Sequence, residues 1–200
     1  MTIASNIKKY ISTIPDGQTF SSNSLRHFAT TENIRQILNR LVKAGEIKRV
    51  ARGVFVKPKQ LSTIGEVLPP TTEVAKILAK TTDETITVQG AEAARLLQLS
   101  TQVPMQLILY TNGNTRTLNI MNRKIKLKHV NPSRLVAAGT TPGLVINALF
   151  YLGRENVTTK TIEMIKHRIS EKEFIETIKL MENMPAWMAD IFYRHQERKK

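Results

Sequence analysis

Apolar residues recur at helical spacing in the first third of the chain, most regularly between positions 30 and 44. The positions at i, i+3, i+4, i+7 and i+8 there are Ile34, Ile37, Leu38, Leu41 and Val42. Such a pattern places the apolar side chains along one stripe of a helix and leaves the other face polar. Gly45 follows the last of them and is expected to end the helix, since glycine adopts the left-handed conformation easily.

Shorter elements flank this helix. Four isoleucines at helical spacing predict a helix over residues 3–14, and a serine cap predicts a short helix from Ser21 or Ser22 to Phe28. Residues 47–50 and 54–56 are expected to form a β-hairpin with Gly53 in its turn. Three helices followed by a basic hairpin are the order of a winged helix-turn-helix. We therefore assign residues 1–58 to such a DNA-binding domain, with the helix at 30–44 as its recognition helix.

The pattern changes after residue 58, and a second domain is expected over residues 72–200. Residues 59–71 are predicted to be a linker, because the Pro69-Pro70 pair favours extended backbone. Helices are predicted over 72–79 and 90–97, strands over 84–88, 105–111, 115–120 and 123–130, and helices from Pro142 onward. The Asn112-Gly113 turn predicts that the strands on either side of it form a hairpin. The fold class is therefore α+β, a winged helix followed by a mixed α+β domain with a helical C-terminus.

The charge of the chain indicates which class of partner it binds. The chain has 30 Lys and Arg against 16 Asp and Glu, a formal net charge of +14. Residues 1–60 hold eleven of the basic residues and three of the acids. A basic N-terminal unit of this kind indicates a nucleic-acid partner, here double-stranded DNA. Cysteine is absent, which excludes disulfides and thiol catalysis, and no signal peptide or membrane span is visible, so we expect a cytoplasmic protein.

The predicted DNA contacts follow from side-chain chemistry. Asparagine, glutamine and arginine match the edges of adenine and guanine in the major groove, whereas other cations suit phosphates. The serine-rich start of the second helix offers N–H groups to a phosphate. The predicted DNA-binding residues are Ser22, Asn23, Ser24, Asn33, Arg35, Gln36, Asn39, Arg40, Lys43, Lys48, Arg49 and Arg52.

A second basic feature lies in the predicted strand 123–130. Lys124, Lys126 and Lys128 alternate with Ile125 and Leu127, so the three lysines share one face. They are a secondary patch for phosphates, or else a solvated strand face or an edge that lysine protects against strand pairing.

The sequence contains no recognisable set of catalytic residues. The four histidines are scattered without metal-ligand spacing, and Gly143 and Gly153 stand alone rather than in a phosphate-binding loop. We therefore expect no enzyme activity, no cofactor and no metal. A nuclease would need an acidic metal cluster, and the three carboxylates of residues 1–60 have unrelated spacings.

Several segments resemble a known family. The segments are 70–76 (PTTEVAK), 90–94 (GAEAA), 99–104 (LSTQVP), 110–113 (YTNG) and 126–129 (KLKH), preceded by a winged-helix-like run at 45–55. Together they resemble the antitoxins of type IV, abortive-infection (AbiEi-like) toxin–antitoxin pairs and the related DUF6088 proteins, over about residues 1–135.

This resemblance implies a transcriptional autorepressor that binds inverted repeats in its own promoter. Binding to inverted repeats requires two copies on the DNA. The resemblance also implies a nucleotidyltransferase-type toxin as a functional partner without stable contact, and no membrane partner. The alternative hypothesis is a general nucleic-acid-binding accessory protein with little sequence preference, which would use charge from both domains.

Overall fold

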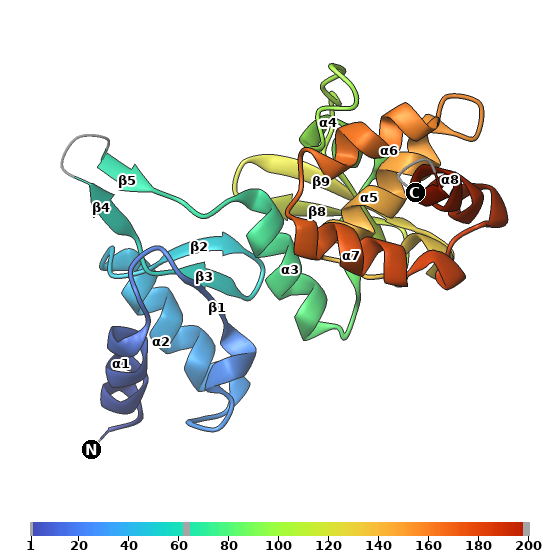
Figure 1. Ribbon diagram of the computed structural model, residues 1–200. Helices are drawn as coiled ribbons and strands as arrows, with labels where there is room; N and C mark the ends of the chain where they lie inside the picture. The colour runs from blue at the N-terminus through green and yellow to red at the C-terminus, as the bar shows by residue number, and fades with distance from the viewer. Residues whose placement is uncertain (1, 62–64, 198–200) are drawn as a thin grey trace. The chain divides into compact units, whose positions relative to one another are not determined.

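The structure is a computed structural model that describes residues 2–61 and 65–197 (Figure 1). It is a mixed α+β protein, and its contacts divide it into two compact units. The first comprises residues 1–83 and 118–123, and the second comprises residues 84–117 and 124–200. Between positions 2–61 and 65–197, no helix is long and apolar enough to cross a membrane.

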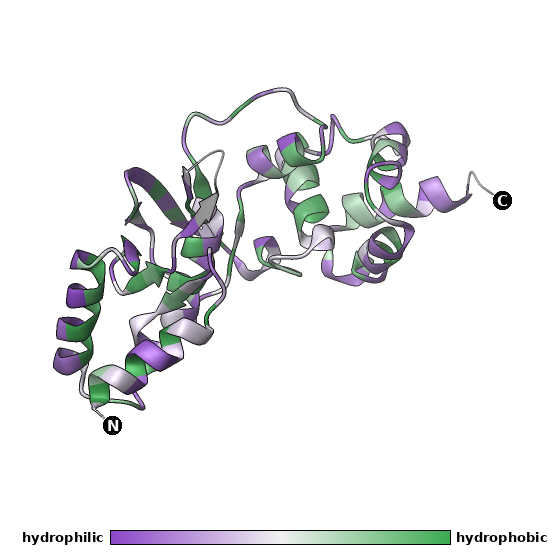
Figure 2. Cartoon of the chain, turned by 90° about the vertical axis from the view of Figure 1, so that its left-hand side faces the viewer, coloured by the Kyte–Doolittle hydropathy of each residue, from purple (hydrophilic) through white to green (hydrophobic). Residues whose placement is uncertain are grey.

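The first unit begins with two amphipathic helices and a small antiparallel sheet. Its elements are α1 (Ile3–Thr13), β1 (Thr19–Ser21), the 3₁₀ turn η1 (Ser22–Leu25), α2 (Thr31–Lys43), β2 (Lys48–Ala51) and β3 (Val54–Val56). The strand order is β1-β3-β2. The helices near the N-terminus are hydrophobic on one side and hydrophilic on the other (Figure 2). Their apolar stripes pack together in one core, so the helical periodicity of the sequence is confirmed.

That core is built from a few residues of each element. Ile7 and Ile11 come from α1, while Ile34, Leu38 and Leu41 come from α2, and all five are buried. Burying a side chain of this size contributes about 1.5–3 kcal/mol relative to leaving it exposed. The packing therefore fixes which face of α2 is turned to solvent.

One prediction for this region needs correction, and one strand was not predicted. The short helix expected from Ser21 or Ser22 to Phe28 is only the single 3₁₀ turn η1, capped by the Ser21 side chain. Strand β1 was not predicted, because three residues are too few to show an alternation. It is held by pairing with β3, where Phe20 lies opposite Phe55.

The segment from residue 59 to α3 contains regular structure. Strands β4 (Lys59–Leu61) and β5 (Gly65–Val67) pair as an antiparallel ribbon, and α3 (Thr71–Thr81) begins after Pro70. Val74, Ala75 and Ala79 of α3 are buried. The contacts place α3 in the first unit, so the second unit starts at residue 84 rather than at the predicted residue 72.

A four-stranded sheet among the described residues has the strand order β6-β7-β9-β8. Its strands are β6 (Ile86–Val88), β7 (Ile108–Thr111), β8 (Arg116–Ile120) and β9 (Arg123–His129). The predicted hairpin around Asn112-Gly113 is wrong, because β7 pairs in parallel with β9 rather than with β8. The parallel register sets Leu109 beside Leu127, and both are buried. Burial of this long-range pair outweighs the local preference of an Asn-Gly turn.

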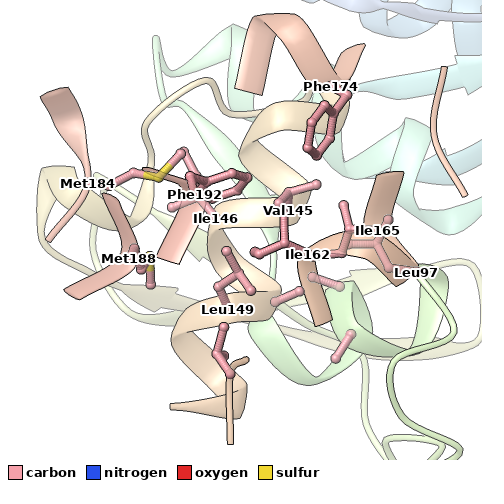
Figure 3. Close-up of a cluster of buried hydrophobic side chains, with 14 residues drawn as sticks. Leu97, Val145, Ile146, Leu149, Ile162, Ile165, Phe174, Met184, Met188 and Phe192 are labelled. Carbon is pink, nitrogen blue, oxygen red and sulfur yellow. The ribbon is translucent and has the colours of Figure 1, made fainter. Parts of the chain in front are cut away.

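Five helices complete the second unit around an apolar core. They are α4 (Gly90–Leu96), α5 (Thr141–Leu152), α6 (Thr159–Lys166), α7 (Glu171–Lys179) and α8 (Ala186–Glu197). Figure 3 shows Val145, Ile146 and Leu149 of α5 among side chains of the neighbouring helices. A Cβ at Gly90 would lie 2.6 Å from the Asn147 carbonyl oxygen, so only glycine lets α4 approach α5 this closely. The helical C-terminus is confirmed, and a capping box between Ser170 and Glu173 begins α7.

Candidate nucleic-acid interface

The outer face of α2 presents polar side chains in a row. The Thr30 side chain caps the helix, since its Oγ1 accepts the Asn33 N–H at 3.4 Å. Burial of the apolar stripe directs the opposite face to solvent. The exposed residues at positions i, i+3, i+4 and i+7 of that face are Gln36, Asn39, Arg40 and Lys43. A single helix therefore carries two amides and two cations that can reach a neighbouring molecule together.

A groove of about 390 Å³ lies beside this helix. It is formed by residues from η1 and its following turn, from α2, and from the β2–β3 hairpin. Its lining residues are Ser22, Arg26, Thr31, Ile34, Arg35, Leu38, Asn39, Arg49, Arg52, Gly53 and Phe55. We call it the arginine groove, because four arginines from three separate segments line it. Guanidinium groups bind phosphate well, since their planar donors match its oxygens.

Backbone contacts hold these segments together. The Ser22 N–H donates to the Gly53 carbonyl at 2.8 Å, which ties η1 to the β2–β3 turn. Gly53 has a φ of +75°, and a Cβ there would lie 3.3 Å from the Ser22 Oγ. Arg49 Nε donates to the Ala51 carbonyl at 3.4 Å. The turn that carries Arg52 is therefore fixed against η1 by glycine's conformational freedom.

One carboxylate, Glu32, lies in the first turn of α2 and binds two of the predicted DNA contacts. Its Oε2 accepts from Arg35 Nε at 3.0 Å, and its Oε1 accepts from Arg35 Nη2 at 2.7 Å and Gln36 Nε2 at 3.3 Å. The Arg35 hydrogen bond, followed by that of Gln36, lowers the pKa of Glu32, and the same pair raises the pKa of Arg35. In the free protein, Arg35 and Gln36 are thus held by an internal partner.

The other acids of this unit's N-terminal segment are also paired. Glu46 binds Lys8 at 2.9 Å and Asp16 binds Lys57 at 2.9 Å. Lys48, a predicted DNA contact, forms an ion pair with Glu66 of β5. In contrast, five cations around α2 and the groove have no carboxylate within 4 Å among the residues that the structure describes. They are Arg26, Arg40, Lys43, Arg49 and Arg52. This surface therefore carries positive charge that no side chain of the described chain neutralises.

The structure brings together part of the predicted set. All twelve predicted residues are exposed except Ser22, which is half-buried. The five that line the arginine groove are Ser22, Arg35, Asn39, Arg49 and Arg52. Asn33, Gln36, Arg40 and Lys43 lie elsewhere on the exposed surface of α2. Asn23 and Ser24 belong to η1 but are not among the lining residues.

Two polar side chains that line the groove were not predicted, and one predicted feature differs in the structure. Arg26 and Thr31 line the groove, and Arg26 could have been found because it stands one turn after Ser22. The expected phosphate site at free N–H groups of the second helix is already used internally. The Asn23 N–H donates to the Ser21 Oγ at 3.1 Å, and the Ser22 N–H donates to Gly53.

The second unit holds a larger cavity, of about 540 Å³, between the start of α6 and one face of α8. Arg154 and Arg194 line it together with Asp190 and Glu197, and Trp187 adds an apolar wall. Because the two signs of charge balance there, this cavity has no net attraction for a polyanion. Within residues 2–61 and 65–197, no cluster of three or more His, Asp or Glu side chains is arranged to hold a metal ion.

Comparisons with known proteins give a family and a distant structural likeness. The model of a family of unknown function (DUF6088) matches residues 6–178. No curated protein matches the sequence. The crystal structure of the RV2827C protein from Mycobacterium tuberculosis is similar at 12% identity and a TM-score of 0.46. That likeness covers 94% of this chain and 73% of the other.

Proposed function

The chain belongs to the DUF6088 family, whose function is unknown, and we propose that it is a sequence-specific DNA-binding transcriptional regulator without enzymatic activity. The observation that carries this proposal is the arginine groove beside the exposed face of α2. Three segments converge there with four arginines. Arg35 is paired with Glu32, but the other three have no carboxylate partner among the described residues, and such a concave cluster favours an anionic partner. The adjoining helix carries amide side chains, which favour a partner whose sequence can be recognised.

We propose that residues 2–58 form a winged helix-turn-helix with α2 as the recognition helix. Support comes from the order of the elements, which is helix, strand, short turn, helix and hairpin. The β2–β3 hairpin would be the wing, with Arg52 at its turn. The major groove of B-DNA, about 12 Å wide, admits an α-helix. A helix with Gln36, Asn39 and Arg40 outward has the donors and acceptors that distinguish base pairs there.

The arginine groove would then bind the sugar–phosphate backbone. Phosphate contacts orient a protein on the duplex, while base contacts select the sequence. Arg26, Arg49 and Arg52 come from outside α2, so they can bind the backbone while α2 lies in the major groove. The carboxylate of Glu32 would release Arg35 and Gln36 as DNA replaces it as their partner.

The biological setting is proposed from the family resemblance. We propose an autorepressor that binds inverted repeats of its own promoter in the cytoplasm as two copies. In that setting it is the antitoxin of a type IV pair, opposing a nucleotidyltransferase-type toxin without stable contact. Growth rescue on co-expression with the neighbouring gene tests this role. A neighbouring gene that is harmless when expressed alone would contradict it.

Gel-shift titrations on the upstream region and on a scrambled duplex test DNA recognition. Arg40→Ala or Gln36→Ala should lower affinity for the upstream duplex by roughly 5- to 150-fold, from about 1–3 kcal/mol per lost base contact, and leave the scrambled duplex less affected. Arg52→Ala or Lys43→Ala should weaken binding to both duplexes and reduce the salt slope by about 1.

Lys9→Ala is the matched control, because Lys9 is an exposed cation on α1 in the same unit. It should leave binding to both duplexes nearly unchanged. Equal binding of the wild type to the upstream and scrambled duplexes would contradict sequence recognition. That result would favour the alternative, a general nucleic-acid-binding accessory protein.

A further inference from the structure

Strand β9 carries a row of lysines that the proposed recognition by α2 does not use. Lys124, Lys126 and Lys128 are exposed, whereas Ile125 and Leu127 between them are each 1% exposed. Side chains alternate between the two faces of a strand, so the three ammonium groups lie on one face at intervals of about 6.6 Å. We call these three residues the lysine row.

The lysine row is not protection of a sheet edge. In the strand order β6-β7-β9-β8, strand β9 lies between β7 and β8, so its backbone is paired on both sides. Lysines that guard against strand pairing are needed on edge strands. The alternative that these lysines block edge-to-edge pairing is therefore wrong, which leaves a solvated strand face or a contact with phosphates.

No described residue forms an ion pair with the lysines of the row. None of the four strands of this sheet contains an Asp or Glu. In the part of the chain that the structure describes, no ion pair involves Lys124, Lys126 or Lys128. Two arginines elsewhere in the second unit do have a carboxylate partner, since Arg95 pairs with Glu92 and Arg116 with Glu84. Three like charges in succession repel one another, and a polyanion relieves that repulsion.

The neighbours of the row indicate which polyanion fits. In the parallel register Lys126 lies beside Ile108 and Lys128 beside Tyr110, and both of these neighbours are half-buried. Protein interfaces depend on buried aromatic and arginine anchors, which a row of lysines does not supply. Single-stranded nucleic acid usually binds by stacking on several exposed rings. The row offers regularly spaced point charges, which suit the phosphates of a duplex.

We propose that the lysine row is a second, sequence-independent contact with the phosphate backbone of double-stranded DNA. This inference rests on the proposed function, because it adds to the contacts made by α2 and the arginine groove. Each phosphate that is neutralised releases counterions and contributes about 0.9 to the salt slope of binding. The row would therefore increase affinity and the salt slope without changing the preference for one sequence over another.

The test uses the full chain with Lys124→Gln, Lys126→Gln and Lys128→Gln combined. A matched variant combines Lys160→Gln, Lys172→Gln and Lys179→Gln, which removes the same charge from exposed helix positions of the same unit. Dissociation constants are measured over a salt series on the upstream duplex, a scrambled duplex and single-stranded RNA. Thermal unfolding of both variants checks that the fold is retained.

We expect the row variant to lose about 2–3 from the salt slope on both duplexes, and roughly 10- to 100-fold in affinity near physiological salt. The matched variant should lose much less, and the ratio of upstream to scrambled affinity should stay constant in both. Equal losses in the two variants, or a loss confined to RNA, would overturn the proposal for the row. Those outcomes leave the proposed function untouched, whereas a wild type without sequence preference would contradict the proposed function instead.

Discussion

The α2 surface and the lysine row are both cationic faces of elements whose other face is buried, yet they differ in chemistry. The α2 surface combines glutamine, asparagine, arginine and lysine, and it adjoins a groove shaped by two further segments. The lysine row repeats one side chain along a single strand. Amides and guanidinium groups have directional donors and acceptors, whereas an ammonium group is a compact charge. The first surface can therefore discriminate between sequences, and the second can only add attraction.

A second difference lies in the acids near each surface. Glu32 holds Arg35 and Gln36 in the free protein, while no carboxylate belongs to the strands around the row. An internal carboxylate penalises binding to any phosphate and is replaced only where better contacts form. The surface proposed to select a sequence therefore has an internal carboxylate that competes with DNA. The lysine row, proposed to bind any duplex, has no such competitor in its strands. The four predictions that follow test this comparison.

The largest effect is expected from removing the support of α2. Leu38 is 1% exposed beneath the helix, and Leu38→Ala should lower the free energy of unfolding by about 2–5 kcal/mol through a cavity in the core. Denaturant titration measures this loss. Asn39→Ala, one position along on the exposed face, should change stability little. Similar losses for both variants would show that α2 does not depend on this core.

The next largest effect concerns the arginine groove. Arg26→Gln should weaken binding to upstream and scrambled duplexes alike and reduce the salt slope by about 0.9, because one phosphate contact is lost. The same titrations in a salt series measure it. Arg154→Gln removes an exposed arginine of the second unit and serves as the control. A loss confined to the upstream duplex would mean that Arg26 contacts a base instead.

A smaller change of opposite sign is expected at Glu32. Glu32→Gln should raise affinity for both duplexes by a few-fold, since it removes a negative charge beside the bound phosphates and frees Arg35. Glu46→Gln provides a comparison, because Glu46 pairs with Lys8 on another part of the unit. Weaker binding of Glu32→Gln would indicate that Glu32 orients Arg35 for DNA rather than competing with it.

The smallest expected effect concerns the stability of the second unit at acid pH. Hydrogen bonds from the Thr141 and Ser170 hydroxyls, then from the Ser170 N–H, lower the pKa of Glu173 to about 2 from an ordinary value of 4.5. A lowered pKa in the folded state means that stability is fully present above about pH 4.5 and is lost as the pH falls toward 2.

Urea midpoints between pH 7 and pH 2.5 measure this loss. Glu173→Gln should remove part of the pH dependence in that range, whereas Glu171→Gln, in the same first turn, should preserve it. An unchanged pH profile in Glu173→Gln would contradict the assignment.

Much of the fold was predictable because its signals are local. The apolar periods of α1 and α2 and the lysine alternation of β9 are each visible within a single element. The pairing of β7 with β9 was not predictable, because it joins strands distant in sequence and competes with a good local turn. The ribbon of β4 and β5 was also missed, since its strands have three residues each.

Part of the candidate site was likewise predictable from the sequence, and part was not. Helical geometry alone identified Gln36, Asn39, Arg40 and Lys43 as exposed neighbours, because burying one stripe of α2 fixes the opposite face. The groove depends on where η1 and the β2–β3 turn meet α2, so Arg26 was overlooked. The pairing of Lys48 with Glu66 likewise depends on the position of β5 beside β2.

By itself, the sequence determined the excess of positive charge, its concentration in the first 60 residues and the amphipathic faces that display it. These properties follow from composition and from the periods of helix and strand, which need no long-range contact. Only the tertiary structure decided which cations share a groove, which are neutralised by a carboxylate, and that β9 lies inside its sheet. Those outcomes depend on contacts between segments far apart in the chain, where burial of apolar surface outweighs local preference.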